Sequence, residues 1–392
     1  MKKQRDTQLL HIGSAPFDPT DHIAPVGLPS IRTSTVRFAN MAALEQTMAK
    51  RAMGERVTTY GISGMQTHRA LEEVFLAIEG GSYCVLSSSG LASIHLALMS
   101  LLKAGDHILI TDNVYGPVRV INETIFKRFN IDVTFFSPAR DRLSELIKPN
   151  TRLVYAESPG SLLMEMLDLP ALAKQAKQLG LSVVVDNTWG CGIYQPLALG
   201  VDVSVVAGTK YINGHSDVLL GAIVTGRDDL AQQIHQMQYA FGNSVSADDA
   251  WLSLRGVKTL AVRLRQHAQN TQAVCQFLRK HPKVSRIYDP AWPQDPGHQI
   301  WRRDCTGANG LIAVSLKCTA PQAQAFVDRL SLFGIGFSWG GYESLVQWVS
   351  PAVLKNHSYW QERDLALVRL HIGLEAVEDL IADLEQAFEC LP

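Results

Sequence analysis

The stretch Asp202-Val-Ser-Val-Val-Ala-Gly-Thr-Lys210-Tyr-Ile-Asn-Gly-His-Ser216 decides how this chain folds. The apolar run after Asp202 predicts a buried strand, and a lysine follows it after three small residues. A lysine in this place is either a surface residue of a β-turn or an amine shielded from water. Shielding would lower its pKa and make it a Schiff-base nucleophile. Lys210 is therefore the first candidate for a catalytic residue.

Short apolar runs alternate with helical patterns on both sides of this stretch, between residues 65 and 225. This alternation predicts an α/β fold with a mostly parallel seven-stranded sheet that is covered by helices. Ligands bind at the carboxyl ends of the strands in such sheets. The predicted strands are Tyr83–Ser87, His107–Thr111, Val133–Phe136, Leu153–Glu157, Val183–Asp186, Val203–Ala207 and Ala222–Thr225.

The chain divides into three predicted segments. Residues 1–60 hold four prolines and one predicted helix, so we expect an arm that lies across a neighbouring subunit. Residues 61–257 form the sheet domain, and residues 258–392 form a smaller C-terminal α+β domain. The elements expected around and within the last segment are a long helix at Ala247–Lys280, strands at Leu311–Leu316 and Phe333–Ser338, and a closing helix at Val377–Phe388.

The composition excludes several function classes. The 392 residues include 36 Lys and Arg against 37 Asp and Glu, a formal charge of −1, so we expect no nucleic-acid partner. No apolar run is long enough to span a membrane, and the start resembles no secretory signal, so we expect a cytoplasmic protein. The 12 histidines and 6 cysteines show no metal-ligand spacing, and no P-loop occurs. Scattered cysteines indicate buried thiols in a reducing compartment.

Three further features lie at the end of a predicted strand or just after one. Asp186 ends one of them and is either a helix cap or a carboxylate that keeps the pyridine nitrogen of pyridoxal phosphate protonated. Ser87-Ser-Ser-Gly90-Leu-Ala92 is either an ordinary N-capped helix start or a cradle for a phosphate. Tyr115 lies in a loop after the next strand and could stack on a cofactor ring.

Taken together, these residues resemble the Cys/Met-metabolism family of pyridoxal-phosphate (PLP) enzymes, which has the aspartate-aminotransferase-like fold, PLP fold type I. The stretch from Asp202 to Ser216 matches the cofactor-lysine signature of that family. Within the family, Glu157-Ser-Pro-Gly-Ser161 and Trp339 are most similar to the bacterial cystathionine β-lyases. The matching pieces Gly256-Val-Lys-Thr-Leu-Ala-Val-Arg-Leu-Arg265 and Leu370-His-Ile-Gly-Leu-Glu375 extend the resemblance over nearly the whole chain.

The resemblance implies a role for each matching residue. Lys210 would hold pyridoxal 5'-phosphate and move protons, Asp186 would pair with the pyridine nitrogen, and Tyr115 would stack on the ring. Arg369 would bind the substrate carboxylate in a bidentate geometry. The residues implied for the phosphate are Gly90, Leu91 and Thr209, and those implied for the substrate pocket are Ser338, Trp339, Tyr60 and Tyr239, with Tyr60 donated by a neighbouring subunit.

The implied reaction is β-elimination from a small sulfur amino acid, with L-cystathionine as the favoured substrate and homocysteine, pyruvate and ammonia as products. The family also implies a homotetramer built as a dimer of dimers, and a place in transsulfuration and methionine biosynthesis. Alternatives within the class are a cysteine or cystine C–S lyase and a γ-lyase or γ-synthase. Outside the class, the chain would be a weakly active PLP-binding homologue.

The chain departs from the family pattern at two positions. The first phosphate motif of the family reads Tyr-x-Arg, but Tyr60-Gly61-Ile62 places isoleucine where the arginine would be. Losing a charge-assisted phosphate contact should weaken cofactor binding by about 1.5–3 kcal/mol. Ser63 could recover part of this as a neutral donor. The second departure is Ala207, which stands where family members often have serine.

Overall fold

A computed structural model describes residues 3–392 and contains a seven-stranded sheet with the order β1-β7-β6-β5-β4-β2-β3. β7 runs antiparallel to both of its neighbours, and the other strands are parallel. The predicted mostly parallel sheet is therefore confirmed. The strands are β1 (Tyr83–Ser87), β2 (His107–Thr111), β3 (Asp132–Phe136), β4 (Thr151–Glu157), β5 (Ser182–Asp186), β6 (Val203–Val206) and β7 (Gly221–Thr225).

Helices cover both faces of this sheet because successive strand residues point to opposite sides. In β5, Val184 packs with the helices on one face, and its neighbours Val183 and Val185 pack on the other. The first face is covered by α4 (Gly90–Leu101), α5 (Gly116–Ile121), the π-helical turn η2 (Asn122–Phe126) and α8 (Asp228–Ala240). The second is covered by α3 (Gln66–Glu79), α7 (Leu169–Gln178) and α9 (Ala247–Val257).

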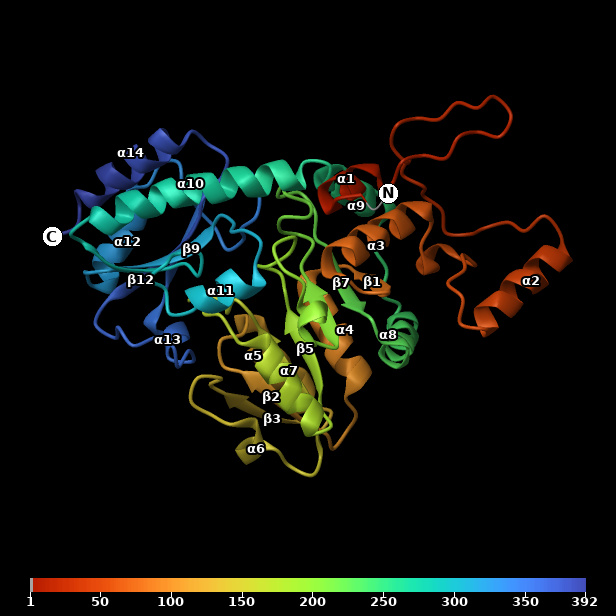
Figure 1. Ribbon diagram of the computed structural model, residues 1–392, viewed down its shortest axis with the longest axis horizontal. Helices are drawn as coiled ribbons and strands as arrows, with labels where there is room; N and C mark the ends of the chain where they lie inside the picture. The colour runs from red at the N-terminus through yellow and green to blue at the C-terminus, as the bar shows by residue number, and fades with distance from the viewer. Residues whose placement is uncertain (1–2) are drawn as a thin grey trace.

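A second sheet of five strands has the order β10-β11-β12-β9-β8. Its apolar core lies against three helices, which Figure 1 shows along the outer side of the sheet. The strands are β8 (Val284–Tyr288), β9 (Leu311–Leu316), β10 (Gly334–Ile335), β11 (Leu345–Val349) and β12 (Ala366–His371), and the helices are α10 (Leu260–Lys280), α12 (Ala320–Arg329) and α14 (Val377–Phe388).

Two expectations for this region were wrong in detail. The stretch Ala247–Lys280 forms two helices and not one, because the helix is interrupted at residues 258–259, between α9 and α10. The strand predicted over Phe333–Ser338 is reduced to the two residues of β10, since the carbonyls of Phe337 and Ser338 accept hydrogen bonds from the Arg369 side chain instead of pairing in a ladder.

Residues 3–60 form an extended segment that holds α1 (Arg5–His11) and α2 (Met41–Ala52). Leu9 of α1 is buried against the main body, whereas α2 buries none of its residues and projects clear of the rest of the chain (Figure 1). Within residues 3–392, no helix has the length and apolar character needed to cross a membrane. The remaining short elements are η1 (Gly61–Ser63), α6 (Leu143–Leu146), η3 (Pro196–Leu199), α11 (His298–Asp304) and α13 (Pro351–Leu354).

Candidate active site

Lys210 lies in the turn that follows β6, where its backbone N–H donates to the Ala207 carbonyl at 3.1 Å. Its Nζ donates to Ser338 Oγ at 2.8 Å and lies 5.4 Å from the centre of the Trp339 ring. Burial lowers the pKa of Lys210 to about 8, and the nearby Arg369 guanidinium adds to this shift, while Asp186 opposes it. An amine with this pKa is partly unprotonated near neutral pH and can act as a nucleophile or base.

Asp186 ends β5, beside Val205 of the strand that leads to Lys210. The Thr188 hydroxyl and backbone N–H both donate to its Oδ1, at 2.5 and 2.9 Å, and the Ala207 N–H donates to the same hydroxyl at 2.9 Å. Burial raises the pKa of Asp186, and the Thr188 hydrogen bonds partly offset the rise. Such a carboxylate would be stabilised by a cationic N–H partner.

Two residues of this centre have roles that the sequence patterns did not indicate. Thr188 connects Asp186 to the lysine turn through its hydroxyl. Glu157 pairs with Asp186 in the β4–β5 ladder and accepts a hydrogen bond at Oε2 from the Tyr115 N–H at 2.5 Å. Burial and the Asp186 carboxylate raise the pKa of Glu157 well above its usual range. The position of Glu157 at the end of β4 could have indicated it.

The start of α4 lies against the same turn. A Cβ added at Gly90 would meet the Ala207 Cβ at 2.5 Å, so only glycine permits this close approach. Ser89 caps the helix by accepting from the Ala92 N–H at 3.1 Å. In the described part of the chain, no group accepts from the backbone N–H of Gly90 or Leu91. Two free donors at the positive end of a helix fit a phosphate.

Thr209 lies beside this cradle but has partners of its own. Its hydroxyl donates to the Leu220 carbonyl at 3.1 Å and accepts from the Leu220 N–H at 2.9 Å. Its predicted phosphate contact therefore stays a prediction.

Tyr115 lies at the start of α5 with its side chain 45% exposed. Burial, Glu157 and Asp186 raise the pKa of Tyr115, and Arg369 opposes the rise, which places the phenol among these groups.

Arg369 approaches from the second sheet. It is buried in β12, and its Nη2 donates to the carbonyls of Phe337 and Ser338 at 2.7 and 3.1 Å. Burial lowers the pKa of Arg369 to about 10, so the guanidinium remains a cation at neutral pH. Its Nε and Nη1 have no hydrogen-bond partner among residues 3–392, so they are available to a carboxylate. The loop between β10 and β11 thus carries Ser338 and Trp339 to Lys210.

Tyr60 and Tyr239 are not brought to Lys210 by this chain. Tyr60 is 50% exposed at the end of the arm. Tyr239 is exposed on α8, where the Arg51 guanidinium lies 5.2 Å from its ring centre and a small cavity is lined by Ile62 and Ser63. Their assignment to the substrate pocket stays a prediction that requires a second subunit.

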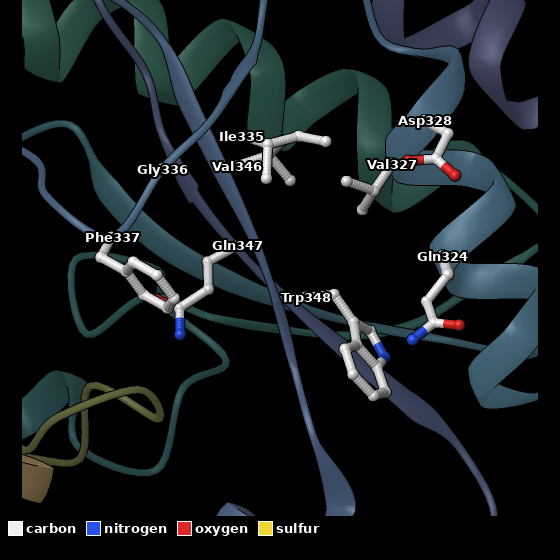
Figure 2. A pocket seen from close by; sticks show the side chains of 9 residues that line it. All are labelled: Gln324, Val327, Asp328, Ile335, Gly336, Phe337, Val346, Gln347 and Trp348. Atoms are coloured by element: carbon white, nitrogen blue, oxygen red, sulfur yellow. The ribbon is translucent and has the colours of Figure 1, made fainter.

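A cavity of about 390 Å³ opens at the free edge of the second sheet (Figure 2). It is lined by Val346, Gln347 and Trp348 of β11 and by Gln324, Val327 and Asp328 of α12, with Trp348 next to Gln324 and Gln347 next to Phe337. The cavity shares Phe337 with the loop described above, but neither Lys210 nor Asp186 lines it. Within the described residues, no group of three or more His, Cys, Asp or Glu is placed to hold a metal ion.

Comparison with known proteins identifies the family. The family model described as "Cys/Met metabolism PLP-dependent enzyme" matches residues 6–389. The chain belongs to this family. It is similar to cystathionine β-lyase of Bordetella avium, with 57% identity over 99% of this chain and 98% of the relative. It is also similar to cystathionine β-lyase MetC of Escherichia coli K12, with 36% identity over 98% of both chains.

A solved structure of the same family supports the fold type I architecture. The crystal structure of cystathionine γ-synthase from Xanthomonas oryzae pv. oryzae in complex with cystathionine superposes with a TM-score of 0.90 and 30% identity, over 100% of this chain and 99% of that chain. The cofactor of this family is PLP, and the site fits it. The fit rests on the half-buried amine of Lys210, the buried carboxylate of Asp186 and the free N–H groups of Gly90 and Leu91.

Proposed function

We propose that this PLP-dependent carbon–sulfur lyase cleaves L-cystathionine by β-elimination to homocysteine, pyruvate and ammonia. The observation that carries the proposal is the Lys210 amine, held by Ser338 Oγ at 2.8 Å between the Asp186 carboxylate and the Arg369 guanidinium. The names of the Bordetella avium and Escherichia coli relatives support cystathionine as the substrate and β-elimination as the reaction.

When bound, PLP supplies an electron sink that makes the Cα–H bond of an amino acid acidic. Asp186 holds the negative charge that would keep the ring nitrogen protonated. Lys210 removes the Cα proton and is suited to this because burial lowers its pKa to about 8. Ser338 fixes the direction of Nζ through their hydrogen bond, so that the base points at one place in the pocket.

Arg369 orients the substrate in this proposal. Its Nη2 is held by two loop carbonyls, and Nε with Nη1 would bind the α-carboxylate. Tyr115, between Glu157 and Arg369, would cover the face of the ring. The Gly90 and Leu91 N–H groups would bind the phosphate, with help from Thr209. Trp339, Tyr60 and Tyr239 would border the substrate.

The product assay tests the proposal. Purified protein with added PLP is given cystathionine, cystine, cysteine and methionine in turn, and pyruvate and 2-oxobutyrate are measured separately. We expect pyruvate and homocysteine from cystathionine at the highest kcat/KM. The alternative of γ-elimination is favoured by the likeness to a γ-synthase structure and would give 2-oxobutyrate and cysteine. Highest kcat/KM with cystine or cysteine would indicate a general C–S lyase, and no product from any substrate would indicate a weakly active homologue.

We also propose that the active chain is a homotetramer of two dimers in the cytoplasm, serving transsulfuration and methionine biosynthesis. The division into an arm (1–60), a PLP-binding domain (61–257) and a C-terminal domain (258–392) belongs to the same proposal. Exposed Tyr60 and the unburied helix α2 support an arm that completes the site of a neighbour. Mixing Tyr60→Ala with Lys210→Ala protein should restore activity, because a mixed dimer has one intact site. Failure of exchanged subunits to regain activity would contradict shared sites.

A further inference from the structure

The loop between β10 and β11, residues 336–344, reaches Lys210. Residues 369–375, at the end of β12 and just after it, hold this loop at three points. Arg369 binds the carbonyls of Phe337 and Ser338 at the start of the loop. At its end, the Glu375 carboxylate accepts from the Ser344 N–H at 2.7 Å and from the Ser344 hydroxyl at 2.9 Å. The third point is His371, which lies between the other two and has received no role so far.

The His371 side chain holds the middle of the loop. It is almost completely buried at the end of β12, and its Nε2 lies 3.1 Å from both the Gly340 N–H and the Gly341 carbonyl. Burial, with the neighbouring His267, lowers the pKa of His371 to about 3, so the ring is neutral. One neutral tautomer accepts from Gly340 and the other donates to Gly341. Either tautomer ties the ring to this two-glycine turn.

The turn that His371 holds lies directly on the catalytic lysine. Gly340 has φ +85°, and a Cβ added there would meet the Tyr211 N at 2.9 Å and the Lys210 C at 3.0 Å. The adjacent Trp339 ring packs 5.5 Å from the Tyr211 ring, which in turn lies 6.0 Å from His371. The loop therefore touches Lys210 through the Ser338 hydroxyl, the Trp339 ring and the Gly340 backbone.

We propose that His371 is a positioning residue that holds the Ser338–Gly341 turn against Lys210 and so fixes the hydroxyl and the indole that surround the lysine amine. The inference rests on the proposed function, because it assigns His371 to the same site. It goes beyond that function in naming the group that keeps the loop closed. The titratable or charged groups that face Lys210 are Asp186 from the first sheet, and Arg369 and His371 from the second.

The test compares His371→Leu with His371→Gln. Leucine fills a similar volume without either hydrogen bond, whereas the glutamine amide can donate or accept as the ring does. Release of the turn should admit water to Lys210 and raise its pKa toward the ordinary range of lysine. We expect His371→Leu to lose about 10- to 100-fold in kcat, the size expected for a misplaced catalytic group. His371→Gln should recover most of the loss.

A second readout needs no turnover. Cofactor-stripped protein is mixed with PLP, and the association rate is measured against pH, since only the unprotonated amine reacts. The midpoint should lie near the Lys210 pKa of about 8 in the natural protein and at higher pH in His371→Leu. If the natural protein binds PLP but cleaves no sulfur amino acid, the proposed function fails while this measurement still tests His371.

The matched control is His267→Leu. His267 is equally buried in the same aromatic cluster, but its Nδ1 contacts the Ile372 carbonyl and not the loop. Its replacement should lower the melting temperature without moving the midpoint. If His371→Leu does not fold, Gly340→Ala replaces it, because its added Cβ pushes the turn away from Lys210. An unshifted midpoint in folded His371→Leu or Gly340→Ala, or a shift of equal size in His267→Leu, would overturn the proposal.

Discussion

The two sheets deliver side chains to the site by different routes. Asp186 and Lys210 lie at or just after the carboxyl ends of neighbouring parallel strands, so the direction of the chain alone brings them together. Arg369 lies inside an antiparallel strand and acts on a loop that begins more than 30 residues earlier in the sequence. The first half of the site is thus built by topology, and the second half by individual hydrogen bonds. Replacing residues that each sheet contributes to the site, and comparing the losses in activity and stability, tests this difference.

The largest effect is expected at Lys210. Lys210→Ala removes the proposed base and the cofactor-binding amine together, and we expect kcat to fall by about 10⁴-fold. The matched control is Lys174→Ala, which removes an exposed lysine on α7 and should leave kcat unchanged. Steady-state pyruvate release checks both variants. Comparable rates for Lys210→Ala and the natural protein would mean that the chemistry does not depend on the end of β6.

The second prediction concerns the support under the parallel strands. Glu79, the last residue of α3, accepts from Asn187 Nδ2 at 2.9 Å and from Ser204 Oγ at 2.7 Å. Burial raises the pKa of Glu79 from 4.5 to about 7, so the folded protein holds its proton more tightly than the unfolded chain does. This contribution to stability is complete below pH 4.5 and is lost as the pH rises to about 7, a loss of about 3 kcal/mol.

Glu79→Gln keeps a group that can accept both hydrogen bonds and removes the titration. Denaturant unfolding between pH 4.5 and 8 should therefore show a free energy of unfolding that falls less steeply with pH in the variant than in the natural protein. Subtracting the two curves isolates Glu79 from the other buried carboxylates. Parallel curves would show that Glu79 is ionised in the folded protein and that burial does not shift its pKa.

The third prediction tests the antiparallel side. Arg369→Lys keeps the charge but loses the planar fork that can hold the loop carbonyls and a carboxylate together. We expect kcat/KM for cystathionine to fall by about 30-fold, mainly through KM, in line with the loss of about one charged hydrogen bond. Arg302→Lys on α11 makes the same exchange at an exposed site and should have no effect. An unchanged KM in Arg369→Lys would remove Arg369 from substrate binding.

The sequence predicted the parallel half of the site better than the other half for a physical reason. A buried apolar strand followed by small residues is a local pattern, and it indicated Lys210, Asp186 and the glycine at position 90 before any family resemblance was considered. Arg369 entered only through the resemblance. No local pattern shows that a residue inside an antiparallel strand contacts the carbonyls of a distant loop, and His371 was missed for the same reason.

The strands of the first sheet were also predicted better from the sequence than those of the second sheet. All seven strands of the first sheet were predicted to within two residues at each end. Six of them are mostly buried apolar runs, whereas in β3 only Phe136 is buried and the predicted strand rested on its β-branched and aromatic residues. In the second sheet, β8, β11 and β12 were not predicted. β8 and β11 are only partly buried and mix polar with apolar residues, and the two residues of β10 lie among glycines, which weakens the signal of a strand.

The smallest effect is expected at Thr188, and it tests whether the parallel half also depends on single hydrogen bonds. The Thr188 hydroxyl donates to Asp186 Oδ1 and accepts from the Ala207 N–H, so it joins β5 to the lysine turn as His371 joins β12 to the loop. Thr188→Val keeps the shape but leaves that N–H without its partner, which should cost about 1–2 kcal/mol in the free energy of unfolding. Thr188→Ser keeps the hydroxyl and should behave nearly as the natural protein in unfolding. Because strand direction already places Asp186 and Lys210 side by side, we expect Thr188→Val to change kcat only a few-fold, far less than His371→Leu. A loss in Thr188→Val as large as in His371→Leu would mean that both halves are held by individual contacts, and the distinction between the two sheets would not stand.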